Sequence, residues 1–311
     1  MTITNNSLKT DLRMASMISQ EIRLLLADSV SLRNTDWMTF VGSINGMGSD
    51  TIKVRKAGLD GFDAALWESF SGGTEADSST DQALTDGSAD VAVKRRALAY
   101  SISDLATMTG MGADLDPFRI AESIAKSYDG MFANLTASAF AGFTDIENSQ
   151  TGAALNVSAL IKAINKLENK NGKTVPGPYV AVMQPKTYGQ LQDSIRAETS
   201  GIIQFIPASY EAISAKGTAY KGQFLGVDIY VSSYVTNNGV DFLSALWGPG
   251  ALGFATGAPS IVGAAEVMEM DQVTIEFERN AQKAKTRVVG HSYLGLSILD
   301  QDRGVLLKSG I

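Results

Sequence analysis

The sequence contains no cysteine and only one histidine among its 311 residues. Without cysteine the chain has no disulfide, no thiolate metal ligand and no cysteine nucleophile. His291 stands among strand-like residues, and one imidazole cannot build a site of several histidines or, without positioned serine and aspartate partners, a catalytic triad. We therefore interpret His291 as a structural residue and expect neither a metal nor a cofactor.

Long apolar runs and strong positive charge are also missing. No run approaches the roughly 18 apolar residues of a membrane span, and the polar segment Met1–Thr10 lacks the hydrophobic region of a signal peptide. We expect synthesis in the cytoplasm and no membrane partner. The formal net charge is -7 and the basic runs are short. Strong binding to nucleic-acid phosphates is therefore not expected, although a surface that tolerates nearby DNA fits.

One segment lacks positive charge altogether, since no lysine or arginine occurs between Lys56 and Lys94. The flanking stretches Thr51–Arg55 and Lys94–Ile102 alternate in the manner of strands, and we expect them to pair as two limbs of one projection. Between them lies an acidic tip rich in glycine, serine and threonine, preceded by the aromatic residues Phe62, Trp67 and Phe70. Compact domains rarely contain so long an excursion without a function. Exposed aromatics need burial against another chain, which favours assembly over catalysis.

Helical periodicity appears in two places before the middle of the chain. Residues 13–30 form an amphipathic candidate, either an N-terminal arm or an ordinary packed helix. The stronger candidate begins with Asp116 as N-cap and Pro117 at the first position, and runs to about Phe140. It would span roughly 36 Å, long enough to act as a spine for other elements.

The remainder reads as an α/β module followed by strands. In residues 152–262 we predict a helix at Ser158–Asn169, a buried strand at Tyr179–Met183 and a helix opening at Pro185. Further strands are expected at Gly226–Val231 and Phe242–Trp247. The closing part alternates at Val273–Glu278, Thr286–Val288 and Tyr293–Leu299, which predicts β structure.

Several short motifs resemble catalytic or binding signatures without their context. Gly248–Gly253 matches G-x-G-x-x-G, but no helix can follow it, so we interpret it as a turn between strands. Gly172–Thr174 follows a helix instead of a strand and reads as a helix stop. Asp300–Gly304 lacks the distal glutamate of a calcium loop and is interpreted as a hairpin turn. Glu276 and Glu278 share one strand face, which could suit paired-carboxylate chemistry. We interpret them as charges exposed to solvent.

The order of these elements, more than any single motif, resembles the major capsid proteins of tailed double-stranded-DNA bacteriophages, the HK97-like fold. Nearly the whole chain takes part. The stretches that carry the resemblance are Gly48–Val54, Val93–Leu105, Asp116–Phe140, Tyr179–Tyr188 and Gly222–Ser233. The resemblance implies an α+β fold with an N-terminal arm (1–50), an extended loop (51–102), a peripheral domain with the spine helix (103–151), an axial domain (152–262) and a return to the peripheral domain (263–311).

The resemblance also implies a function without chemistry. Copies would assemble as pentamers and hexamers into an icosahedral shell that encloses double-stranded DNA without reading its sequence, in a virion assembled in the host cytoplasm. The arm helix follows the start of the chain at once, which implies a separate scaffolding protein. A portal and a cement or decoration protein are further implied partners. No cross-link between subunits is predicted.

Two alternatives stay open at this point. An encapsulin-type nanocompartment shares the fold and differs in enclosing protein cargo, and an enzyme would need a convergent polar pocket that the sequence does not supply. For the subunit interface we hypothesise that the acidic loop meets a basic cluster on a neighbouring copy, with aromatic anchoring. The residues are Phe62, Leu66, Trp67, Glu68, Phe70, Glu75 and Asp77 on the loop, and Arg279, Lys283, Lys285 and Arg287 in the cluster.

Overall fold

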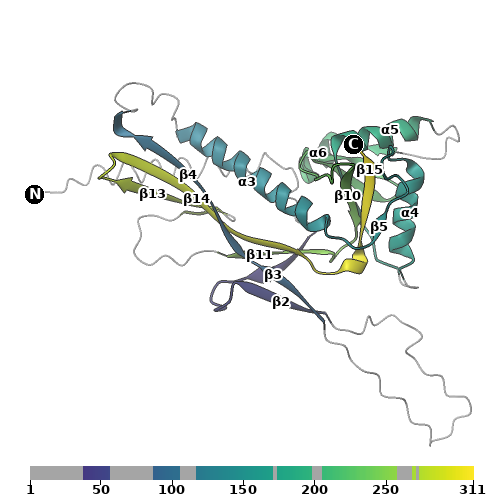
Figure 1. Ribbon diagram of the computed structural model, residues 1–311, viewed down its shortest axis with the longest axis horizontal. Helices are drawn as coiled ribbons and strands as arrows, with labels where there is room; N and C mark the ends of the chain where they lie inside the picture. Colours follow the sequence, from purple (N-terminus) through teal and green to yellow (C-terminus); the bar gives the residue numbers. More distant parts are fainter. Residues whose placement is uncertain are drawn as a thin grey trace, which may run out of the picture.

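Two sheets and one long helix organise the protein. The computed structural model describes residues 38–56, 87–105, 117–170, 174–197, 205–257, 268–270 and 273–311. The predicted arm helix at 13–30 and the loop residues 57–86 lie outside these ranges. Figure 1 shows an elongated sheet beside helix α3, a compact lobe at one end, and a two-stranded hairpin that projects from the sheet.

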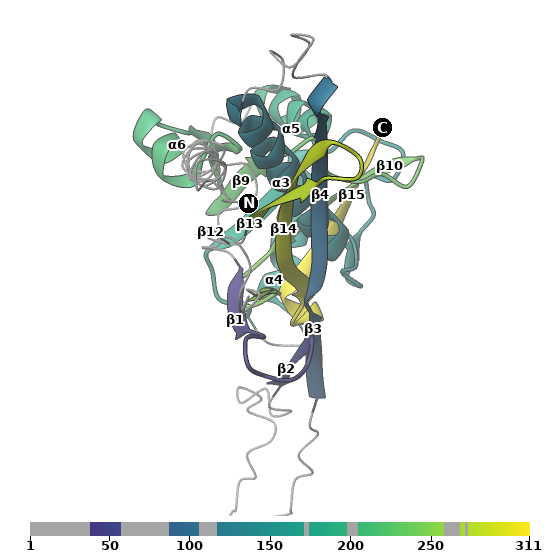
Figure 2. The same cartoon turned by 90° about the vertical axis from the view of Figure 1, so that its left-hand side faces the viewer.

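The elongated sheet has six strands, ordered β1-β11-β14-β13-β12, with β4 on the other edge of β14. Its centre is β14 (Lys285–Ile298), a single strand of 14 residues where two separate strands had been predicted. The other members are β1 (Thr39–Ser43), β4 (Lys94–Ser103), β11 (Leu252–Gly257), β12 (Met268–Met270) and β13 (Val273–Asn280). Figure 2 shows β4 and β14 side by side along their length.

The second sheet has seven strands and forms the compact lobe. Its order is β5-β15-β10-β6-β9-β8-β7. The strands are β5 (Ile146–Glu147), β6 (Tyr179–Met183), β7 (Phe205–Pro207), β8 (Tyr220–Phe224), β9 (Val227–Val231), β10 (Asp241–Trp247) and β15 (Gly304–Gly310). Every residue of β6 is buried, as expected for a strand covered on both faces.

Four helices are described. They are α3 (Pro117–Phe140), α4 (Val157–Glu168), α5 (Pro185–Ala197) and α6 (Tyr210–Lys216). The three longer ones confirm the predicted helices, and the starts at Pro117 and Pro185 are confirmed as well. Asn156 caps α4 by accepting a hydrogen bond from the Ala159 backbone N–H at 2.9 Å, which satisfies one of the free N–H groups of its first turn.

The two faces of the seven-stranded sheet have different covers. α4 and α5 bury one face through a cluster that includes Leu160, Leu191 and Ile229. The C-terminal half of α3 buries the other, where the Phe140 ring stacks on Trp247 with centroids 5.5 Å apart. Since the N-terminal half of α3 lies on the six-stranded sheet, this helix joins both sheets, as a spine would.

Two further chain crossings connect the sheets. The Gly248–Ala251 turn leads from β10 to β11, as predicted for a turn between strands. The segment after β14 was predicted to be a hairpin turn, and this is wrong. A 3-10 helix at Gln301–Arg303 carries the chain instead to β15, which pairs with β10 and β5. The tight passage needs Gly304, because a Cβ there would lie 2.2 Å from the Phe143 ring.

The pairing predicted for the projecting hairpin is also wrong in part. The partner of β2 (Thr51–Lys56) is β3 (Gly87–Ala92), in a register that sets Thr51 opposite Ala92 and Lys56 opposite Gly87. The predicted return limb, Lys94–Ile102, lies within β4 (Lys94–Ser103) and pairs with β14. Alternation alone could not distinguish the two, because a strand pattern identifies which side chains share a face but not which strand supplies the hydrogen bonds.

Candidate functional site: surfaces around the spine helix

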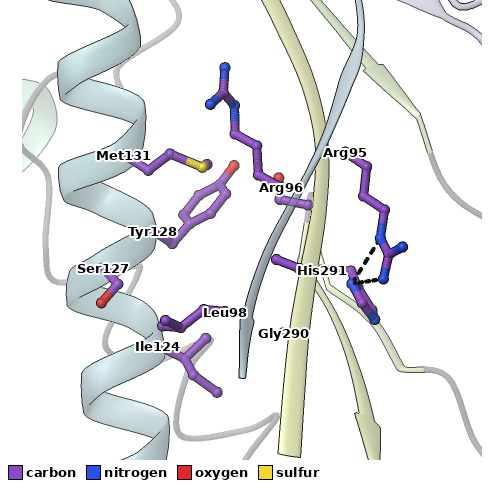
Figure 3. A pocket seen from close by; sticks show the side chains of 11 residues that line it. Arg95, Arg96, Leu98, Ile124, Ser127, Tyr128, Met131, Gly290 and His291 are labelled. Atoms are coloured by element: carbon purple, nitrogen blue, oxygen red, sulfur yellow. Dashed lines mark hydrogen bonds between the residues drawn. The ribbon is translucent and has the colours of Figure 1, made fainter. Parts of the chain in front are cut away.

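The surface between α3 and the six-stranded sheet contains a groove. Its volume is about 450 Å³, and its lining includes Arg95, Arg96, Leu98, Ile124, Tyr128, Met131, His291 and Ser292. Figure 3 shows Ile124, Tyr128 and Met131 projecting from α3 toward the strands, with Arg96 and Leu98 on the side of β4 that faces the helix. Apolar side chains therefore form most of its walls, and a guanidinium stands among them.

Strand geometry explains which side chains enter the groove. Arg96 lies opposite Ser292, and Leu98 opposite Gly290, in the antiparallel register of β4 and β14. Directly opposed residues of such a pair have their side chains on the same face. Arg96, Leu98 and Ser292 therefore face α3, while Gly290 has no side chain and Ile124 of the helix packs against it.

The opposite face of the same strands holds a different polar pair. Arg95 donates from Nε and Nη2 to Nδ1 of His291, at 3.4 and 3.2 Å. Figure 3 shows this pair on the far side of the strands from α3. His291 is buried within β14, so the structural role predicted for the single histidine is confirmed. Arg95 and Arg96 are adjacent in sequence but have different environments.

The predicted basic cluster lies on one hairpin. β13 and β14 pair so that Arg279 is opposite Thr286 and Arg287 is opposite Glu278. Lys283 is exposed on the turn between them. The Arg287 guanidinium lies 3.5 Å from the Glu278 carboxylate, with both side chains exposed, and such pairs contribute only ~0–1 kcal/mol. The fold thus brings the four cluster residues into one hairpin, on which Lys283 and Arg287 are exposed. It is called here the basic hairpin.

The proposed counterpart of the basic hairpin is on the loop. Its residues Phe62, Leu66, Trp67, Glu68, Phe70, Glu75 and Asp77 all lie outside the described residues. The structure therefore does not test the contact between loop and basic hairpin, which stays a hypothesis. Sequence reasoning missed the groove, because Arg96 and Ser292 are far apart in the chain and only strand pairing brings them together.

A set of ion pairs joins α4 to the crossing between the sheets. Lys166 Nζ lies 3.0 Å from Glu147 Oε2, and Lys170 Nζ lies 2.8 Å from Asp145 Oδ2 and 3.6 Å from Asp302 Oδ1. Burial raises the pKa of the Glu147 carboxyl, but hydrogen bonds from Ser149 and Lys166 outweigh this, so the pKa is lowered. Burial lowers the pKa of Lys170, but its bond to Asp145 outweighs it and the pKa is raised.

Neither a metal centre nor a membrane span is found in the part of the chain described. Within the ranges given above, no group of three or more histidine, aspartate or glutamate residues could hold a metal ion. Nor does any described helix combine the length and hydropathy needed to cross a bilayer.

The chain has the HK97-like fold, as solved structures of low sequence identity show. The capsid of Ralstonia phage GP4 matches with a TM-score of 0.57 at 11% identity, covering 84% of each chain. Mycobacterium phage Che8 gives 0.52 at 13%, covering 88% of this chain and 89% of that one. The SrpI encapsulin complex of Synechococcus elongatus PCC 7942 gives 0.55 at 11%, covering 83% and 81%.

The sequence family is more specific than the fold. The family model described as phage capsid protein matches residues 87–306, more than half of the chain, and the chain belongs to this family. No curated protein matches it in sequence. The protein is therefore a major capsid protein, a structural component of the virion that associates with itself in a shell and is not an enzyme. This confirms the resemblance inferred from the sequence.

Proposed function

We propose that copies of this chain assemble as pentamers and hexamers into an icosahedral shell around double-stranded DNA, inside the host cytoplasm. The observation that carries the proposal is the capsid family match over most of a chain that also has the HK97-like fold. Residues 152–262 would line the centre of each capsomer, and the six-stranded sheet would meet neighbours at the edges. A closed shell multiplies modest interfaces through multivalency.

The contact between loop and basic hairpin belongs to this proposal. Carboxylates of the loop would face Arg279, Lys283, Lys285 and Arg287 of a neighbouring copy, while Phe62, Leu66, Trp67 and Phe70 provide apolar anchoring. Because exposed ion pairs add little affinity, the charges would set register and encounter rate. The aromatics would supply most of the binding energy.

Assembly would further involve a scaffolding protein, a portal and possible cement or decoration proteins. The test is electron microscopy of the purified protein, alone and co-expressed with the products of neighbouring genes. Closed shells that contain nuclease-protected DNA after co-expression are the expected result. Absence of closed particles under every combination would reject the proposal.

The second candidate is an encapsulin-type compartment, favoured by the fold likeness to the Synechococcus encapsulin complex. It differs in its contents. Mass spectrometry and nucleic-acid analysis of purified particles separate the two, because a compartment would hold a protein cargo and no DNA of genome length.

A further inference from the structure

The chain contains three asparagines that are followed directly by glycine, and the structure describes two of them. They are Asn45–Gly46 in the turn after β1 and Asn238–Gly239 in the turn before β10. The third, Asn171–Gly172, lies outside the described residues. Both described pairs are exposed, and a Cβ added to either glycine would meet no atom within 4 Å. Exposure and local space therefore do not distinguish the two sites.

An asparagine that precedes glycine can lose its side-chain amide without an enzyme. The glycine nitrogen, once it has lost its proton to hydroxide, attacks Cγ of the asparagine, and ammonia leaves after taking a proton from water. The five-membered succinimide so formed adds water at one of its two carbonyls, which gives aspartate or isoaspartate. Glycine has no Cβ to obstruct the approach. The rate therefore depends on how firmly the fold holds the glycine N–H and the asparagine side chain.

Hydrogen bonds hold both groups at Asn238. Its Oδ1 accepts from the backbone N–H groups of Val240 and Asp241, at 3.0 and 2.7 Å. The N–H of Gly239 donates to Oδ1 of Asn237 at 3.2 Å. The first two bonds fix the orientation of the side-chain amide, and the third stabilises the protonated form of the attacking nitrogen. The fold thus disfavours the reaction at this site.

The turn that contains Asn45 leaves the glycine nitrogen available. The turn is closed by a hydrogen bond from the Met47 N–H to the Ile44 carbonyl, at 3.1 Å. Gly46, with a φ of 77°, occupies its third position, whose N–H takes no part in the closing bond. Within the described ranges, the Gly46 N–H has no acceptor. Asn45 donates its own backbone N–H to Ser43 Oγ at 3.4 Å, which involves neither reacting group.

We infer that Asn45 is a site of spontaneous deamidation in the folded subunit, whereas Asn238 is protected. The inference goes beyond the proposed function, because it requires the folded subunit and not the shell. The attacking nitrogen is in the same chain, and hydroxide and water are the only co-reactants.

The position of Asn45 gives the modification a structural effect. On one side of it, the Ile44 N–H donates to the Thr256 carbonyl of the six-stranded sheet at 3.0 Å. On the other side, the Val93 N–H donates to the Asp50 carbonyl at the base of the projecting hairpin, at 2.8 Å. Isoaspartate would put one extra carbon into the backbone between these two fixed points. The modification therefore changes the joint between sheet and hairpin.

The inference is tested by incubating the full-length, unassembled subunit at mildly alkaline pH and following both sites by peptide mapping. Mass spectrometry detects the conversion of amide to acid, and labelling with an isoaspartyl methyltransferase detects isoaspartate. We expect Asn45 to convert at least about tenfold faster than Asn238, as three hydrogen bonds of ordinary strength imply. Equal rates, or a faster reaction at Asn238, would overturn the inference.

The unfolded chain is the matched control, because it keeps the neighbouring residues of each site and removes the turns. In guanidinium chloride the two sites should convert at similar rates. A rate ratio as large as that of the folded subunit would assign the difference to the neighbouring residues alone and refute the structural argument.

Asn237→Ala tests the protection directly, since it removes the acceptor of the Gly239 N–H. The rate at Asn238 should rise several-fold while the rate at Asn45 stays the same. Asn134→Ala, on an exposed position of α3, should change neither rate. An unchanged rate at Asn238 in the Asn237→Ala variant would contradict the protective role of this bond.

Hydrogen exchange tests the effect on the projecting hairpin. The isoaspartate fraction should exchange faster in β2 than the unmodified subunit does, because the lengthened backbone disturbs the joint. Freshly purified Asn45→Asp supplies the negative charge without the extra carbon and should exchange as the unmodified subunit does. Unchanged exchange in the isoaspartate fraction would reject the structural effect.

Discussion

Ile124 of α3 lies directly over Gly290 of β14. A Cβ added to Gly290 would be 3.3 Å from Ile124 Cγ2, and Ile124 itself is 3% exposed. A side chain at residue 290 would require Ile124 to move by a few tenths of an ångström, so glycine favours this close approach. This contact fixes the N-terminal half of α3 on the six-stranded sheet, while Phe140 and Trp247 fix its other end on the seven-stranded sheet.

Ile124→Asp is expected to destroy the fold. The substitution places an unpaired charge in a buried contact, which costs several kcal/mol or forces the carboxylate to take up a proton. The variant should be insoluble or rapidly degraded, as measured by the soluble fraction and by limited proteolysis. Asn134→Asp, on an exposed position of the same helix, is the control and should remain soluble. A soluble Ile124→Asp protein that assembles normally would contradict the packing described.

Gly304→Ala tests the crossing from β14 to β15. The added Cβ would overlap the Phe143 ring. Overpacking of this kind typically lowers the free energy of unfolding by about 1–3 kcal/mol. Chemical denaturation of the subunit should show the loss. Gly189→Ala, inside α5 with open space around it, should instead be neutral or stabilise by about 0.5–1 kcal/mol. Equal effects of the two substitutions would argue against close packing at residue 304.

Acid should weaken the junction held by Glu147 and Lys166. The pKa of Glu147 is lowered from its ordinary value of 4.5, so its contribution to stability is present above that value and is lost as the pH falls through the lower, folded-state pKa. Glu147→Gln should cost about 1–3 kcal/mol at neutral pH and should flatten the acid side of the stability profile. The exposed Glu211→Gln is the control, and an unchanged profile in Glu147→Gln would refute the role of this carboxylate.

Charge reversal on the basic hairpin should slow assembly in a manner that depends on salt. Lys283→Glu combined with Lys285→Glu removes the proposed attraction to the acidic loop, so light scattering should show slower assembly at low salt. The difference should shrink at high salt, where screening is strong. Lys162→Glu with Lys221→Glu, two exposed lysines of the other lobe, gives the same change in net charge without the same slowing.

Trp67→Ala tests the apolar part of that interface. Because burial of an aromatic side chain is only weakly sensitive to ionic strength, assembly should weaken at low and at high salt alike. The concentration at which shells first form, measured by sedimentation, should rise at both. Unchanged assembly in this variant and in the charge-reversed one would leave the loop without the proposed partner.

Local patterns in the sequence determined most of the individual elements. The proline starts of α3 and α5, the stripe of Ile120, Ile124 and Tyr128, and the apolar run of β6 each predict a helix or strand from neighbouring residues alone. Their order was enough to suggest the capsid fold, because that order is itself a property of the sequence. The absence of cysteine excluded thiol chemistry in the same direct way.

Pairing between distant segments was decided only by the tertiary structure. Alternation predicted strands at Thr51–Arg55 and at Lys94–Ile102, but it could not assign β3 to the first and β14 to the second, because backbone hydrogen bonds carry no signature in side-chain order. The groove depends on the same pairing. Arg96 and Ser292 become neighbours only when β4 lies beside β14 and α3 covers both, so the groove is a property of the folded chain.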